Sequence, residues 1–278
     1  MAAERMTLHL DPVCAAGNLI IVLDVLARTP NERYADLASI SRRIREDYDF
    51  TERTEPLSLA RALGLLAAVD GGVALSATAR MIARMRLASR TDALHFLLLA
   101  AWRGADDPTL ARSWVYRRFC DRLWSQGAAT LDAVETKRIV ADLLDAAQQE
   151  FAGLKRAALS PKSVLGMRKW LEALEPAVFC QDRFRRRDVC SAELLLLAIG
   201  QTAREDGASL GADLLLTPAR RDAICRICLL EPAALDRAVD RAMPAFPRLI
   251  EPGTRAGAYG RFIRLKAMPS IEALADRP

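Results

Sequence analysis

Residues 60–80, ARALGLLAAVDGGVALSATAR, give the clearest indication of the fold. Two apolar runs flank the tripeptide DGG at residues 70–72. Glycine supplies the positive φ that a tight turn needs, so the pattern predicts a two-stranded hairpin. Ser76 follows the second run, and its hydroxyl is suited to cap a helix that begins at Ala77.

Three helices are predicted before this hairpin. Residues 18–27 (NLIIVLDVLA) form a short apolar segment. Residues 34–48 place apolar side chains three to four residues apart, which is the period of an amphipathic helix. Glu55-Pro56 starts the third helix, because proline fits the first turn, and Gly64 is its expected end.

Three helices, a hairpin and a closing helix resemble a winged helix-turn-helix module over residues 15–90. The resemblance is carried by residues 60–80, where GLL precedes the turn and an apolar residue followed by Ser leads into the next helix. It implies that the third helix enters the major groove of DNA and that the hairpin, the wing, touches phosphate or the minor groove.

Residues 91–175 are predicted to be an all-helical connector. Asp107-Pro108 and Ser160-Pro161 each place a capping side chain before a proline of the first helical turn. Two amphipathic stripes follow, and such stripes usually belong to a core. Their residues are Val134, Ile139, Val140, Leu143, Leu144, Ala147 and Phe151, and then Val164, Met167, Leu171 and Leu174.

The pattern of residues 176–278 predicts the same order of elements without recognisable sequence identity, so a second winged module is expected there. Three helices and two strand-like runs are predicted, in the order 191–204, 217–229, 231–243, 248–250 and 260–266. The predicted fold class is therefore mainly α with small β-hairpins. Two winged-helix-like modules, residues 1–90 and 176–278, flank the helical residues 91–175.

The composition is that of a globular protein. Apolar residues make up 51% and charged residues 27% of the 278, which excludes the disordered, collagen-like and coiled-coil classes. No apolar run approaches the roughly 20 residues of a membrane span. The first residues lack the apolar region of a signal peptide. We therefore expect a cytoplasmic protein with no membrane partner.

Signatures of catalysis are scarce. The sequence contains no nucleophile elbow, no phosphate loop and no dinucleotide-binding glycine motif. His95 lies in an apolar run, where a hydrogen-bonded core histidine is the favoured interpretation. Asp236 and Asp240 alternate with Arg237 and Arg241, a pattern typical of charge pairing rather than acid–base catalysis. We expect a protein that is not an enzyme, with no catalytic residues and no cofactor.

The cysteines leave a structural zinc site as an alternative to free thiols. Cys225 and Cys228 form a C-x-x-C pair, which Cys180 and Cys190 would complete. The close pair lies inside a predicted helix rather than on a knuckle, so reduced free cysteines and no metal are favoured.

Basic residues point to double-stranded DNA as the partner, held mainly through its phosphates. The formal net charge is only +5, but residues 71–90 and 253–270 contain arginines and no acid. A solvated charged face is an equal alternative for each stretch. Further arginines cluster at residues 183–187. The candidate DNA-binding residues are Arg42, Arg43, Arg61, Arg80, Arg84, Arg86, Arg237, Arg241, Arg255, Arg261, Arg264 and Lys266.

Two functional hypotheses follow. The first is a DNA-binding protein of a transcriptional, DNA-handling or antiviral defence assembly in bacteria. The second is a non-catalytic adaptor whose winged modules dock a protein partner or a second copy. Its layout resembles the tandem winged-helix subunits that bind kleisins in chromosome-organising complexes. That likeness is architectural only, and a fold does not determine a function.

Overall fold

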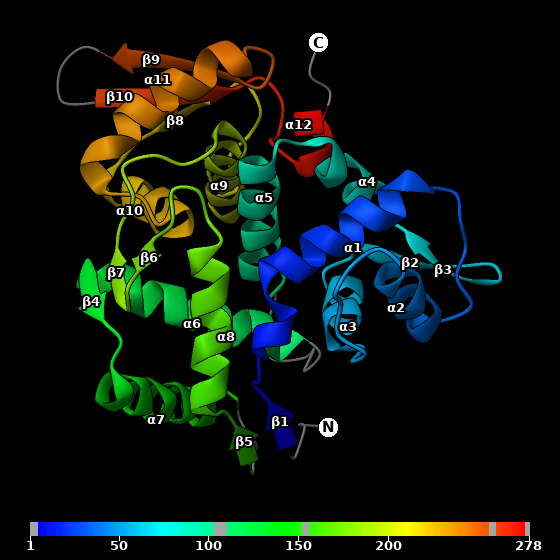
Figure 1. Cartoon of the computed structure of the whole chain (residues 1–278). Helices are drawn as coiled ribbons and strands as arrows, with labels where there is room; N and C mark the ends of the chain where they lie inside the picture. Colours follow the sequence, from blue (N-terminus) through cyan, green and yellow to red (C-terminus); the bar gives the residue numbers. More distant parts are fainter. Residues whose placement is uncertain (1–4, 103–109, 152–155, 256–259, 276–278) are drawn as a thin grey trace.

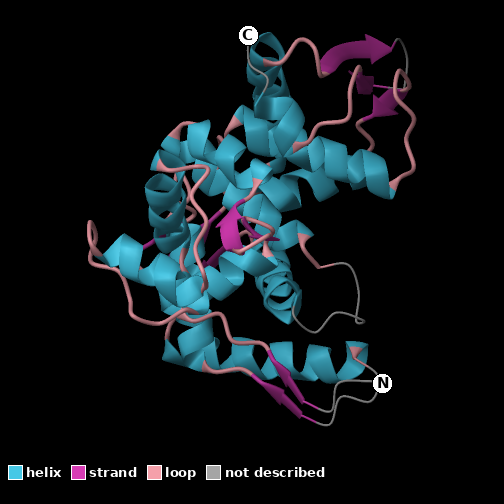
Figure 2. Cartoon of the chain, turned by 90° about the vertical axis from the view of Figure 1, so that its right-hand side faces the viewer, coloured by secondary structure: helices cyan, strands magenta, loops and turns pink. Residues whose placement is uncertain are grey.

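The computed structural model describes residues 5–102, 110–151, 156–255 and 260–275. Helices dominate, and the strands form only two- and three-stranded sheets, which confirms a mainly α fold with small β-elements. Figure 2 shows the helices as the bulk of the molecule. Within these ranges no helix is both long and apolar enough to cross a membrane. The predicted helix start at Asp107-Pro108 lies outside the described residues.

The N-terminal module, residues 16–84, has the predicted elements. They are α1 (Ala16–Arg28), α2 (Leu37–Arg45), α3 (Glu55–Ala62), β2 (Leu66–Val69), β3 (Gly72–Leu75) and α4 (Ala77–Arg84). The antiparallel pair β2–β3 is the expected hairpin. Tyr34 adds an isolated bridge to Val73 on the other side of β3. The Ser76 side chain accepts a hydrogen bond from the Ala79 amide, so the predicted cap is confirmed.

The middle region runs from α5 to β7. It contains α5 (Leu87–Ala100), α6 (Ala111–Gln126), β4 (Ala128–Thr130), α7 (Ala133–Glu150), β5 (Arg156–Ala158), α8 (Pro161–Glu172), β6 (Phe179–Cys180) and β7 (Arg183–Arg185). The prediction that residues 91–175 are all helical was wrong. β4 pairs with β7, and β5 pairs in parallel with β1 (Arg5–Thr7). Each strand has three residues and a partner far away in the chain, so local periodicity carries no signal for it.

The stripe predicted for α7 is partly wrong as well. Ile139, Leu143 and Ala147 are buried, but Val134 is 77% exposed. Successive residues of a helix are separated by about 100°, so Val134, five positions before Ile139, points about 140° away from the buried row. Ser160 also differs from expectation, since its side chain forms no capping hydrogen bond to α8.

The C-terminal module, residues 192–265, shows a similar order of elements. It consists of α9 (Ala192–Glu205), β8 (Asp213–Leu215), α10 (Pro218–Cys228), the short helix η3 (Pro232–Ala234), α11 (Leu235–Ala245), β9 (Ile250–Arg255) and β10 (Gly260–Leu265), and α12 (Ile271–Ala275) follows. The antiparallel sheet has the order β8-β10-β9. Tyr34, β3 and β2 are arranged in the same way in the N-terminal module.

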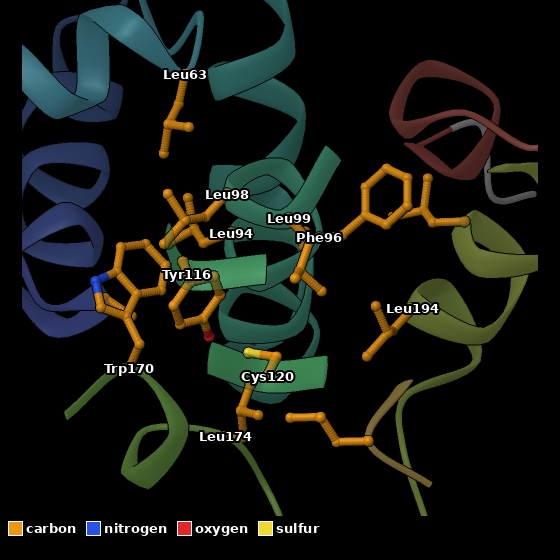
Figure 3. Close-up of a cluster of buried hydrophobic side chains, with 14 of the residues drawn as sticks. Leu63, Leu94, Phe96, Leu98, Leu99, Tyr116, Cys120, Trp170, Leu174 and Leu194 are labelled. Atoms are coloured by element: carbon orange, nitrogen blue, oxygen red, sulfur yellow. The ribbon is translucent and has the colours of Figure 1, made fainter. Parts of the chain in front are cut away.

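Helix α5 joins the two modules. It stands near the centre of the molecule, with α9 on one side and α1 on the other, and contacts both (Figure 1). Leu94 and Leu98 of α5 lie in the same apolar cluster as Tyr116 of α6 and Trp170 of α8 (Figure 3). The buried side chains of the described residues form one connected core. Both modules are therefore held by a shared interior.

Candidate nucleic-acid interface

Helix α11 has one buried and one exposed face. Leu235, Ala238, Val239 and Ala242 are buried, whereas Arg237, Asp240 and Arg241 are exposed. The four-residue spacing of Arg237 and Arg241 places them on neighbouring turns of the same face. The sequence therefore presents two guanidinium groups to solvent from the third helix of the C-terminal module.

The acids of α11 are paired with arginines from other elements. Arg221 of α10 donates two hydrogen bonds to Asp236, of 3.0 and 2.7 Å. Arg261 of β10 forms ion pairs with both Asp236 and Asp240. The hydrogen bonds from Arg221 lower the pKa of Asp236 below its usual value. Charge pairing on this helix is thus confirmed, but its partners are not Arg237 and Arg241.

Arg237 and Arg241 consequently form no ion pair with another described residue. Their charges are free to meet an anionic ligand, while the two neighbouring carboxylates are neutralised. Arg248, three residues beyond the end of α11, is also exposed and has no ion pair among the described residues. Arg248 was not among the candidate residues predicted from the sequence, although it lies only five residues before the acid-free stretch 253–270.

The cations of the β9–β10 hairpin in the C-terminal module are less available than the composition of this segment suggests. The Arg264 guanidinium lies 2.9 Å from Asp213, and the Lys266 ammonium lies 3.3 Å from Glu251. With Arg261 bound to α11, these three cations are all compensated within the module. Nothing is described of the Arg255 side chain. Arg261, Arg264 and Lys266 thus lie near one another at this hairpin as members of ion pairs.

The candidate residues of the N-terminal module divide into two groups. Arg43 is paired with Glu46 and Asp47, and Arg80 donates to the Leu75 carbonyl at 2.6 Å. The other four are exposed and form no ion pair with a described residue; they are Arg42, Arg61, Arg84 and Arg86.

The candidates do not form one continuous surface. The N-terminal module, with α2, α3 and its hairpin, lies on the right of Figure 1, and α11 with β9 and β10 lies at the upper left. The expected arginine cluster at residues 183–187 is also divided. Arg183 and Arg185 are exposed, Arg186 lies over the Trp124 ring at 4.4 Å, and Arg187 is buried. Exposed arginines without a described ionic partner therefore occur both in the N-terminal module and around α11.

The remaining candidates from the sequence are His95 and the cysteines of the predicted zinc alternative. His95 is fully buried and hydrogen-bonds the Tyr116 hydroxyl at 2.7 Å and the Ile227 carbonyl at 3.0 Å, which confirms a satisfied core histidine. Burial lowers its pKa to about 4. No group of three or more potential ligands suited to a metal ion occurs in the described part of the chain. Cys180 is exposed, whereas Cys225 and Cys228 are buried.

A cavity of about 320 Å³ lies between α5, α6, α9 and α10. Arg226 pairs with Asp222 of the same helix, α10, at 2.8 Å and lies 3.9 Å from Asp121 of α6. Burial raises the pKa of the Asp121 carboxyl. Since both carboxylates face the same guanidinium, the group is an ion-pair cluster, and we assign it no catalytic role.

Compared with known proteins, the chain matches no family model, no curated protein and no solved structure. A function therefore has to be inferred from the residues of the chain, among which Arg237 and Arg241 share the exposed face of α11.

Proposed function

We propose that the chain contains two winged-helix modules and binds double-stranded DNA through the outer face of α11, mainly at phosphates. The shared order of helix, strand contact, two helices and two strands supports the winged-helix interpretation. In both modules, the segment between the first two helices pairs with the last strand, Tyr34 with β3 and β8 with β10. This is the arrangement that we expect where the last two strands form a wing.

One observation carries the proposal. Arg237 and Arg241 are exposed without a described ionic partner, whereas the acids beside them are neutralised by Arg221 and Arg261. A third helix with free guanidinium groups can approach the phosphates flanking the major groove. The wing cations would contribute less, because a phosphate must first displace Asp213 or Glu251.

The test compares two double variants in a fluorescence anisotropy titration with a labelled duplex of arbitrary sequence. Arg237→Ala/Arg241→Ala removes the proposed contacts. Arg183→Ala/Arg185→Ala removes the same charge from the exposed side chains of β7 and serves as the matched control. We expect the α11 variant to weaken binding by at least about tenfold, from roughly 1 kcal/mol for each lost contact. Equal losses in both variants would mean that net charge, not α11, attracts the duplex.

A second candidate function is the adaptor. It is favoured by an open groove of about 1020 Å³ at the junction of the modules, lined by Leu63, Leu97, Trp102, Leu110 and Ile271 among others. Apolar side chains in such a groove suit a protein segment better than a nucleic acid. Wild-type protein that does not bind the duplex even at low salt would support this second function over the first.

A further inference from the structure

The cavity between α5, α6, α9 and α10 has an apolar wall and an acidic one. The apolar wall consists mainly of Phe96, Leu99 and Ile227, with Trp102 beside them. Phe96 and Leu99 extend from a different side of α5 than Leu98, which belongs to the central core (Figure 3). The volume of about 320 Å³ lies at the lower end of the range for small-molecule sites. The space therefore suits a compact organic molecule rather than a polymer.

The acidic wall carries three carboxylates. Asp121 comes from α6, Glu205 from α9 and Asp222 from α10, so only the folded chain brings them to one space. Asp222 has its own cation, because Arg226 donates a hydrogen bond to it at 2.8 Å. Glu205 accepts a hydrogen bond from Gln201 at 2.8 Å but forms no ion pair with a described residue. The negative charge of this wall is thus only partly compensated.

Asp121 is the partly buried carboxylate of this cavity that lacks a close cation. Its side chain is 31% exposed, and its one ion pair among the described residues is that with Arg226, at 3.9 Å. Burial raises the pKa of Asp121, and the positive charges of Arg226, Arg117 and Arg118 do not cancel this effect. A carboxylate in such a poorly hydrated place is stabilised when a cation is brought into direct contact with it.

The two arginines of the lining do not reverse the charge of the cavity. Arg226 already has partners besides Asp222, since it donates to the Ser125 hydroxyl at 3.2 Å and lies over the Trp124 ring at 4.7 Å. Arg117 is exposed, so water screens its charge. Three carboxylates and two guanidinium groups give the lining a formal charge of −1.

We propose that this cavity binds a small organic cation, a primary ammonium group carried by an aromatic or alkyl body. The ammonium group pairs with Asp121, and the body lies against the apolar wall, whose aromatic side chains also attract cations. The cavity adjoins the open groove at the junction of the modules, because Phe96, Trp102 and Gln201 are among the residues that line both. The groove gives the ligand a route from solvent. This binding does not depend on whether α11 binds DNA.

Titration calorimetry of the chain with 2-phenylethylamine and with hexylamine tests the proposal. 2-Phenylethanol and phenylacetate keep the ring but replace the ammonium by a neutral or a negative group. We expect one site for each amine, and binding at least about tenfold tighter than that of the alcohol or the acid, because hydrogen bonds between charged groups are the strong ones. Absence of binding by both amines, or equal binding of the alcohol, would overturn the proposal. Tighter binding of phenylacetate would overturn it in favour of an anion site.

Variants locate the ligand within the chain. Asp121→Asn keeps the size of the side chain and should weaken the binding of 2-phenylethylamine at least about tenfold. The matched control is Asp145→Asn, which removes the same charge from an exposed position of α7 outside the cavity and should leave the affinity unchanged. An equal loss in the control would mean that net charge alone attracts the amine, which would contradict the assignment.

A second variant tests the apolar part of the site without changing any charge. Ala223 of α10 lines the cavity, so Ala223→Leu should fill part of it and abolish the binding of both amines. Circular dichroism checks that the Asp121 and Ala223 variants are folded. Unaltered affinity in either folded variant would place the ligand elsewhere and overturn the proposal.

Discussion

At the scale of single residues, Arg187 and Asp92 form an ion pair that is almost completely buried. The two side chains are 1% and 0% exposed, and they join α5 to the segment that precedes the C-terminal module. Asp92 also accepts the Ser191 amide at 2.9 Å. A charge buried so deeply is tolerated only while its partner is present, since the protein interior solvates it poorly.

Replacing Asp92 by Ala should therefore destabilise the protein strongly. Removing one member of a buried pair costs about 3–5 kcal/mol, because the remaining charge is left uncompensated. Urea unfolding followed by circular dichroism measures the change. The control is Asp47→Ala, which removes surface ion pairs with Arg28 and Arg43 and should cost about 0–1 kcal/mol for each pair. Similar values for the two variants would show that the buried pair is not structurally important.

His95 should make stability depend on pH. Burial keeps this histidine neutral in the folded protein, with a pKa of about 4 compared with the ordinary value of 6.5. As the pH falls from 6.5 toward 4, the unfolded chain binds a proton that the folded chain does not, so the free energy of unfolding decreases. The contribution of His95 is complete above this window and is lost across it, by about 1.4 kcal/mol per pH unit at most. Arg187 and Asp92 are the charged groups that act on it.

Urea titrations at several pH values check this expectation. His95→Gln lacks the titrating group, so its free energy of unfolding should decrease less steeply between pH 6.5 and 4 than that of the wild type. Parallel curves for the two proteins would contradict a neutral, buried His95.

At the scale of elements, local signals predicted those parts of the fold that depend on local chemistry. The hairpin follows from the DGG turn, and α4 begins where Ser76 caps it. The three-residue strands β4, β5 and β8 were not predicted, because their partners come from distant segments and contribute nothing to a local pattern. Val134 shows the same limit, because the spacing of apolar residues along a helix does not reveal which of its turns packs against another element.

The two serines at helix starts offer a direct comparison. Ser76 accepts a hydrogen bond from the Ala79 amide at 3.1 Å, whereas Ser160 forms no side-chain cap. Ser76→Ala should cost about 1 kcal/mol, and Ser160→Ala should cost much less. Thermal or urea unfolding of the two variants measures both values. A larger loss for Ser160 would mean that capping does not determine where these helices begin.

On α11, the charge of Asp240 should oppose DNA binding. Asp240→Asn removes a negative charge from the exposed face and releases Arg261 from one of its ion pairs. We expect severalfold tighter binding and a steeper salt dependence, by up to about one unit of slope. Asp142→Asn, which removes one of the two ion pairs between Arg122 of α6 and the acids of α7, changes the net charge equally. Equal effects of the two variants on duplex affinity would exclude a specific contribution from α11.

At the scale of the whole molecule, the sequence showed which residues are basic but not which of them are available. Arg264 pairs with Asp213, and Lys266 with Glu251, through contacts between strands that the acid-free stretch does not reveal. Arg237 and Arg241 remain free for the opposite reason, because Arg221 and Arg261 occupy the acids beside them. The candidate site was thus predictable in composition, whereas its availability depends on tertiary structure.

The most direct test of duplex binding is the salt dependence of wild-type affinity, measured by fluorescence anisotropy at several salt concentrations. Each phosphate neutralised by a cation releases counterions and adds about 0.9 to the slope of log K against log salt. If α11 is the principal contact, we expect measurable binding at low salt and a slope that falls by about two in Arg237→Ala/Arg241→Ala. Absence of binding at low salt, or a slope unchanged in that variant, would contradict the proposed function.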